Sequence, residues 1–282
     1  MAIKEEIEDK LVLEVLQASS AENKAPLVEY ITDNEKGRIS LSSQSFGKLI
    51  AARASGNFTS EADRLILEEI QLFGGNSIAN LLRFGEGVSY AAVVQDVAVK
   101  VKADVRKGTC EEMERAILVK VLEKAWEKMT EDERSKFTTK FTEKAVGVGP
   151  AALAAVVAAA KLGGFATYEL AAIVANAISR QIIGKGLGFA ANATLMGTMG
   201  DVLGIMAGPF GWAITGAWLL ADVSGPAYRV TVPCILHIAF LRLAINNQKK
   251  VCPNQQCNFI NDRNAKFCSN CGTPLAHLVA SN

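Results

Sequence analysis

Residues 146–164 read VGVGPAALAAVVAAAKLGG, and residues 184–221 read GKGLGFAANATLMGTMGDVLGIMAGPFGWAITGAWLLA. The whole stretch 146–222 carries only three basic and three acidic side chains. Val202 to Ala221 are twenty consecutive uncharged residues, and a helix of that length spans about 30 Å, the thickness of a bilayer core. The chain is organised around this stretch, which is either a buried hairpin of helices or a membrane-active one.

Glycine and tryptophan mark the second half of this stretch. Three glycines fall four residues apart on one helix face, where small residues allow two helices to approach closely: Gly200, Gly204 and Gly208. Alternatively, Gly208 and Pro209 form a simple turn between two short helices. Trp212 and Trp218 are candidate interfacial anchors in a membrane. We favour core packing for both, because Gly208-Pro209 would kink a single spanning helix in its middle.

The first half of the chain reads as a series of amphipathic helices with short breaks. Ser60 precedes Asp63, Thr109 precedes Glu112 and Thr130 precedes Glu133, each with the spacing of a capping box. The segment 88–104 is rich in valine, so a strand competes there with a helix. The pattern predicts an all-α fold: a multi-helix bundle with a glycine-rich apolar helical hairpin and a small C-terminal zinc ribbon.

Four cysteines cluster near the end of the chain in CPNQQCNFINDRNAKFCSNCGTPL. Cys252 and Cys257 are separated by four residues, and Cys268 and Cys271 by two, so two knuckles can surround one tetrahedral Zn²⁺. The motif resembles the short zinc ribbons appended to many bacterial proteins, although their first knuckle usually has two intervening residues. A module of this size has few other means of folding, which favours a structural metal over free thiols.

Motifs for catalysis are poor. Gly184-x-Gly186-x-Gly188 lacks the strand and the spacing of a dinucleotide fingerprint. Cys234 and His237 are three residues apart on one predicted helix face, but no orienting acid can be named, and a core histidine is the simpler interpretation. The sequence predicts a protein that is not an enzyme and has no evident small-molecule substrate.

Charge divides the chain into three parts. Residues 1–145 carry 21 basic and 25 acidic side chains, whereas residues 223–282 carry six basic and one acidic. We expect an amphipathic helical domain (1–145), a glycine-rich apolar helical region (146–247), and the zinc ribbon with its tail (248–282). The first ten residues lack the apolar core of a secretory signal, and clustered cysteines suit a reducing compartment. We therefore expect cytoplasmic residence, with the inner face of a membrane as an alternative site.

Several stretches resemble the bacterial YaaW-like family over about residues 10–245. They are DNEKGRISLSS (33–43), LFGGNSIANLLR (72–83), VKVKAD (99–104), AWEKM (125–129) and SGPAYRVTVPCILHIAFLR (224–242). The resemblance brings no known catalytic residues. Its partial grouping with mitochondrial cytochrome-complex assembly chaperones implies a helical, chaperone-like domain, with the zinc ribbon as an added module.

Two functions follow as hypotheses. In the first, the glycine-rich apolar region engages or permeabilises a membrane as a stress or antiphage effector. In the second, the protein is a soluble chaperone or scaffold whose zinc ribbon binds protein or nucleic acid. Either is compatible with self-association through the glycine face.

Overall fold

The computed structural model describes most of the helical part of the chain and much of the cysteine module. The described residues are 2–38, 41–74, 87–104, 108–141, 147–161, 165–184, 228–246, 250–251, 254, 257, 260–261 and 265–275. Over these residues the fold is all-α, as predicted, apart from two short strands at the C-terminal end. The five residues proposed for close helix packing or membrane contact, Gly200, Gly204, Gly208, Trp212 and Trp218, lie outside the described residues. The hairpin they would form stays a prediction.

The helices follow one another with short connections. They are α1 (Ala2–Ala18), α2 (Ala21–Thr32), α3 (Ser43–Ser55), α4 (Ser60–Gly74), α6 (Tyr90–Val101), α7 (Cys110–Lys128), α8 (Glu131–Phe141), α9 (Pro150–Lys161), α10 (Phe165–Ile183) and α13 (Tyr228–Asn246). The strands β1 (Lys250–Val251) and β2 (Ile260–Asn261) pair antiparallel.

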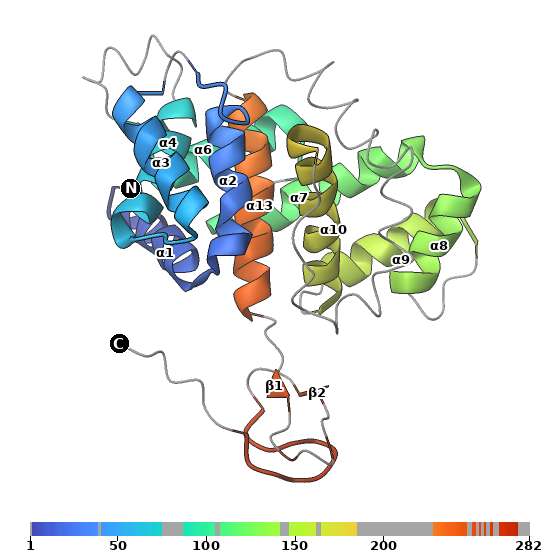
Figure 1. Ribbon diagram of the computed structural model, residues 1–282. Helices are drawn as coiled ribbons and strands as arrows, with labels where there is room; N and C mark the ends of the chain where they lie inside the picture. Colours follow the sequence, from blue (N-terminus) through green and yellow to red (C-terminus); the bar gives the residue numbers. More distant parts are fainter. Residues whose placement is uncertain are drawn as a thin grey trace.

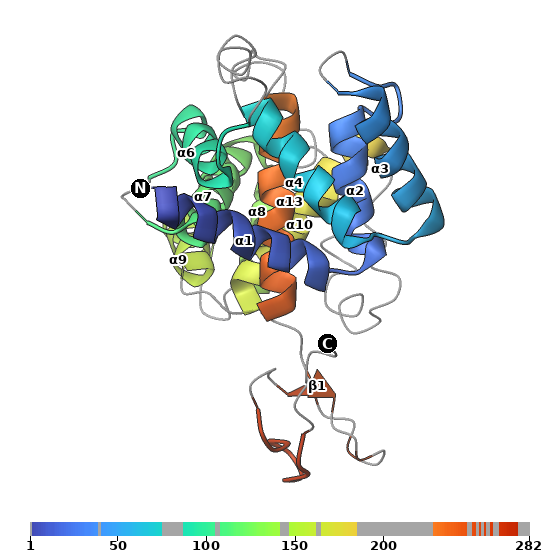
Figure 2. The same ribbon diagram turned by 90° about the vertical axis from the view of Figure 1, so that its left-hand side faces the viewer.

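Helix α13 is the centre of the described fold. In both views it runs through the middle of the helical body, with α1, α2 and α4 on one side and α7 and α10 on the other (Figures 1 and 2). Every residue from Val230 to Leu243 is buried. A helix that is apolar all round its surface is stable only when other helices cover it on all sides, which is the position of α13. One apolar core extends from Val12 on α1 to Leu243 on α13.

The structure corrects the organising role given to residues 146–221. Within the described part, the helix that the others surround comes from residues 228–246, after that stretch. Its neighbour α10 falls inside the stretch and packs along α13 more extensively than any other described helix. Helix α10 is buried from Thr167 to Ser179, so this part of the apolar stretch belongs to the core.

Helix caps explain most of the boundaries. The capping box of Thr109 and Glu112 is present in full, and Thr130 and Glu133 exchange the same reciprocal hydrogen bonds. The box predicted at Ser60 is wrong. Thr59 caps α4 instead, because its hydroxyl accepts a hydrogen bond from the Ala62 amide.

Two further predictions concern helix type and extent. The valine-rich segment 88–104 is the helix α6 and not a strand; its polar positions face outward while Val93, Val94 and Val97 are buried. Helix α13 begins at Tyr228, five residues before the predicted start at Pro233. Proline deprives a helix interior of one hydrogen bond, and burial on all sides offsets that cost here.

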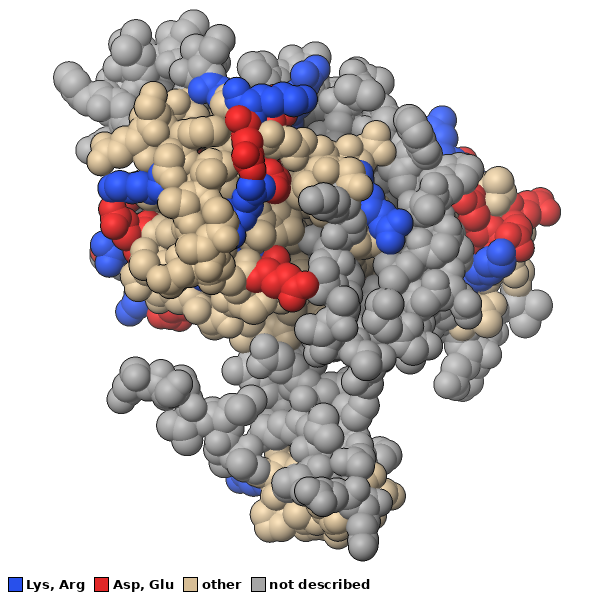
Figure 3. Space-filling view, in the orientation of Figure 1, with Lys and Arg blue, Asp and Glu red and all other residues tan. Residues whose placement is uncertain are grey.

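The C-terminal module lies apart from the helical body, beyond the end of α13 (Figure 1). It has its own small buried cluster of Cys268 and Leu275, separate from the main core. The boundaries predicted at residues 145 and 247 remain predictions. Over the face in Figure 3, acidic and basic side chains intermingle on the helical body and do not gather by sign.

Candidate functional site

Three of the four predicted metal ligands lie together in the C-terminal module. The Sγ atoms of Cys257, Cys268 and Cys271 are all within 4.8 Å of one another. Cys268 is buried, Cys257 is half-buried and Cys271 is exposed. Cys252, the fourth predicted ligand, lies outside the described residues. The fold thus gathers cysteines from both knuckles, which are eleven residues apart between Cys257 and Cys268.

Backbone hydrogen bonds shape the second knuckle. The Gly272 amide donates to the Cys268 carbonyl at 2.8 Å, and the Cys268 amide donates to the Thr273 carbonyl at 2.8 Å. Gly272 has a φ of +74°, in the left-handed region that favours glycine. This turn directs the chain back toward the sulfurs. The buried side chain of Asn261 on β2 supports it by accepting hydrogen bonds from the Ser269 amide and hydroxyl.

The spacing of the sulfurs suits a tetrahedral metal. At a zinc–sulfur distance of about 2.3 Å, two sulfurs of a tetrahedron lie about 3.8 Å apart. Cys257 Sγ and Cys268 Sγ are 3.7 Å apart. The apolar cluster of the module contains only Cys268 and Leu275, with Cys257 and Ala265 packed against it. So small a core cannot stabilise a fold by burial alone, and this group of cysteines could hold a metal ion.

The helical body contains a buried ion pair that the sequence did not reveal. Arg242 on α13 donates from Nε and Nη2 to the carboxylate of Glu114 on α7, at 2.9 and 3.1 Å. The hydroxyl of Tyr90 on α6 donates to the same carboxylate at 2.9 Å. Burial raises the pKa of Glu114, and Arg242 and Tyr90 hold that rise back. Burial lowers the pKa of Arg242, but Glu114 reverses that direction and raises it overall.

This network fixes the position of three helices relative to one another. A single residue removed from it would leave a buried charge without its partner, which is costly. Sequence reasoning noted only that Arg242 interrupts an apolar helix. A lone arginine within an otherwise apolar buried helix is the signal that a buried acid faces it, although the identity of that acid depends on the fold.

Cys234 and His237 do not form a catalytic pair among the described residues. His237 is buried between the rings of Tyr30 and Phe240, and its Nε2 is 2.7 Å from the Asn23 carbonyl. Burial lowers the pKa of His237 to about 4, so the ring is neutral and donates from Nε2. Burial raises the pKa of the Cys234 thiol. A neutral ring held by a backbone carbonyl is a core histidine, in line with the simpler interpretation.

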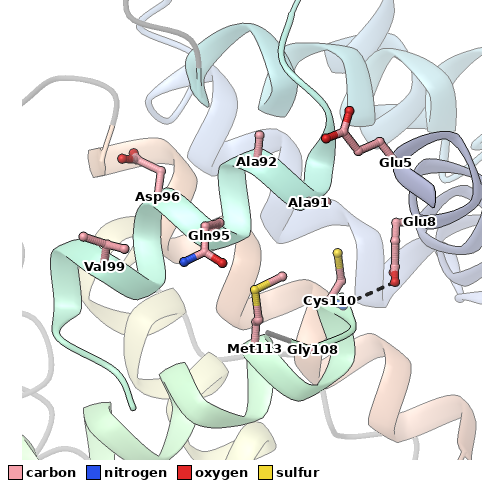
Figure 4. Close-up of a pocket in the computed structure, with 10 residues that line it drawn as sticks. All are labelled: Glu5, Glu8, Ala91, Ala92, Gln95, Asp96, Val99, Gly108, Cys110 and Met113. Carbon is pink, nitrogen blue, oxygen red and sulfur yellow. Dashed lines mark hydrogen bonds between the residues drawn. The ribbon is translucent and has the colours of Figure 1, made fainter. Parts of the chain in front are cut away.

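A surface groove opens between α1, α6 and the start of α7, and the sequence did not predict it (Figure 4). Its volume is about 540 Å³. Its lining residues are Glu5, Glu8, Ala91, Ala92, Gln95, Asp96, Val99, Gly108, Cys110 and Met113. Burial, followed by the nearby carboxylates of Glu8 and Glu114, raises the pKa of the Cys110 thiol. Cys110 is therefore a poor nucleophile at neutral pH, and the groove is a surface for binding.

Comparison with known proteins places this fold in a family. Residues 61–237 match the family described as ubiquinol-cytochrome C chaperone, from α4 into α13. A UPF0174 protein of Helicobacter pylori strain J99 is 40% identical over 194 residues, covering 68% of this chain and 74% of that protein. The UPF0174 protein YaaW of Escherichia coli K12 is 32% identical over 241 residues, covering 83% and 94%. The chain belongs to the YaaW-like UPF0174 family. No solved structure matches it.

The family assignment confirms the resemblance drawn from the sequence, and it points to a non-catalytic protein. The matched segment ends at residue 237, so the cysteine cluster follows it. Of the described helices, α13 is long and apolar enough to cross a membrane, or two spans arise if α9 and α10 count as one bent span. In α13, 78% of the apolar window is buried inside the protein, as expected for a core helix. The comparisons therefore favour the chaperone hypothesis over a membrane effector.

Proposed function

We propose that the helical body is a chaperone-like protein that binds other proteins, and that it performs no catalysis of its own. The observation that carries the proposal is the match of residues 61–237 to the ubiquinol-cytochrome C chaperone family. That segment supplies most of the helices that enclose α13. A rigid body with a preformed surface groove is the kind of scaffold that can hold a partner without remodelling itself.

We further propose that the C-terminal module is a zinc ribbon with a structural Zn²⁺. Cys257, Cys268 and Cys271 would supply three thiolates, and Cys252 would supply the fourth from its place in the sequence. Zinc suits a set of thiolate ligands, and four of them leave no open position for a substrate. The ion would supply the stability that the small apolar cluster lacks. Thiolate ligands also accord with residence in the reducing cytoplasm, which we propose for the whole protein.

An aggregation assay tests the chaperone proposal. A chemically unfolded model enzyme is diluted into buffer with increasing amounts of the full-length protein, and light scattering is followed. We expect scattering to fall as the molar ratio approaches about one to one, with serum albumin at equal mass as the inert control. Unchanged scattering at several-fold excess would refute it. Release of dye from anionic vesicles in the same preparation would restore the membrane hypothesis in its place.

A further inference from the structure

The groove between α1, α6 and α7 combines a shape and a charge that select a partner. Glu5 and Glu8 reach it from α1 and Asp96 from α6, while alanine, valine, methionine and glycine form much of the remaining wall (Figure 4). No lysine or arginine lines it among the described residues. The three acids also form no ion pair with a described residue. Lys100, the nearest base along α6, lies instead over the ring of Tyr228 at 5.2 Å.

Exposed apolar side chains gather on the same two helices. Large hydrophobic residues are exposed at four described positions, and three belong to the helical body: Ile7 and Leu11 on α1, and Val99 on α6. Val99 is 66% exposed and lines the groove itself. Exposed apolar residues that gather beside a cavity are a mark of an interaction surface, whereas scattered ones carry no such meaning.

The volume and the charge together define the occupant. A volume of about 540 Å³ falls within the usual range of pockets that bury a ligand. Apolar walls with carboxylates complement an amphipathic helix that carries cations beside its apolar stripe, a recurring mode of peptide recognition. Acidic or purely apolar segments would leave the three carboxylates repelled or without partners.

We propose that this groove binds a helical segment of a client protein that presents Lys or Arg beside apolar side chains. The inference rests on the proposed chaperone-like function and names the chemistry of the client that it recognises. Cations of the segment pair with Glu5 and Asp96 at the groove, and apolar side chains pack against Ala92, Val99 and Met113. Opposite charge draws the segment in and fixes its orientation.

A peptide-binding experiment on the full-length protein tests the proposal. The probe is a fluorescein-labelled, amidated 15-residue helix of leucine and lysine, followed by fluorescence anisotropy. Two matched peptides replace every lysine by glutamate or every leucine by serine. We expect only the leucine–lysine peptide to bind well, and its binding to weaken as salt screens the charges.

Two variants of exposed groove residues locate the site. Asp96→Lys reverses one charge and Ala92→Trp fills the space, and each should weaken binding by about tenfold. The matched controls are Glu68→Lys and Ala54→Trp, which make the same changes on exposed positions of α4 and α3. Binding by the controls should stay within about twofold. Thermal melts establish that all four variants are folded.

The outcomes separate this proposal from the chaperone proposal. Loss of peptide binding in the two groove variants alone supports the groove, even if aggregation of the model enzyme is not suppressed. Suppression by wild type and both groove variants alike, with unchanged peptide binding, leaves the chaperone function intact and overturns the groove. Failure of wild type to bind the leucine–lysine peptide also overturns it, including where a second copy or another segment of the chain fills the groove.

Discussion

The helical body and the C-terminal cysteine module are stabilised by different means. The body has one core that runs through ten described helices, and its buried charges are paired, as in Glu114 with Arg242. The module has one buried apolar contact cluster, centred on Cys268 and Leu275, and a group of thiols. A long chain can bury enough apolar surface to fold by itself, whereas a few tens of residues need a cross-link or a metal.

This difference predicts that the two parts respond to different perturbations. Removal of a metal should unfold the module and spare the body. Removal of a buried partner should unfold the body and spare the module. The four predictions below test that separation, from the largest expected effect to the smallest.

The first prediction concerns the cysteines. Replacing both Cys268 and Cys271 by serine should abolish tight zinc binding, because structural zinc in small modules contributes about 10–16 kcal/mol of apparent binding free energy. Elemental analysis should find about one zinc per wild-type chain and none in the double variant. Cys110→Ala, which removes a thiol from the body, should keep its zinc. Full zinc content in the double variant would contradict the assignment, and an altered melt of the body would contradict the separation.

The second prediction concerns the buried ion pair. Arg242→Met should lower the free energy of unfolding of the body by about 3–5 kcal/mol, since it leaves Glu114 buried without a cation. Adding Glu114→Met should recover most of that loss. Urea unfolding followed by circular dichroism measures both. The exposed pair of Lys48 and Glu61 is the control, and Lys48→Met should have little effect. Equal effects of Arg242→Met and Lys48→Met would show that the pair has no structural weight.

The third prediction concerns acid. The pKa of His237 is lowered from 6.5 to about 4 in the folded body, so the unfolded chain binds the additional proton between these values. Stability should therefore fall as pH falls through this window, by about 1 kcal/mol per pH unit. His237→Gln should reduce that slope between pH 6.5 and 5, above the range where carboxylates titrate. An identical slope in wild type and His237→Gln would refute the assignment.

The fourth prediction concerns a helix end. Thr109→Ala removes the reciprocal cap of α7 and should cost the body about 1 kcal/mol. Thr139→Ala is the control, since its exposed hydroxyl bonds only the carbonyl of Ser135 one turn earlier. Thermal melts of both variants, with zinc content measured in parallel, should show a shift for Thr109→Ala alone and no change in zinc.

Local patterns predicted the helices well and long-range contacts poorly. The caps at Thr109 and Thr130 involve residues three positions apart, so the sequence alone identifies them. Ser60 was misread because Asp63, its presumed partner, pairs instead with Lys24 on α2 at 2.7 Å. That contact joins residues 39 positions apart, and no local pattern contains it.

The same distinction applies to the candidate sites. Cysteine spacing predicted the cluster, since two knuckles constrain their own geometry. The groove could not be predicted, because Glu5, Asp96 and Met113 come from three helices that meet only in the folded body. Residues 146–221 drew attention because apolar runs are conspicuous. The centre of the described fold is α13, whose burial depends on six other helices around it.

Hydrogen–deuterium exchange on the full-length protein, before and after zinc chelation, tests the separation of the two parts most directly. Peptide-level exchange reports each region within one intact chain. We expect chelation to abolish protection in residues 250–275 and to leave the protection of α13 and the helices around it unchanged. Loss of protection that spreads into α13, or retained protection of residues 250–275 without metal, would contradict a self-sufficient helical body joined to a metal-dependent module.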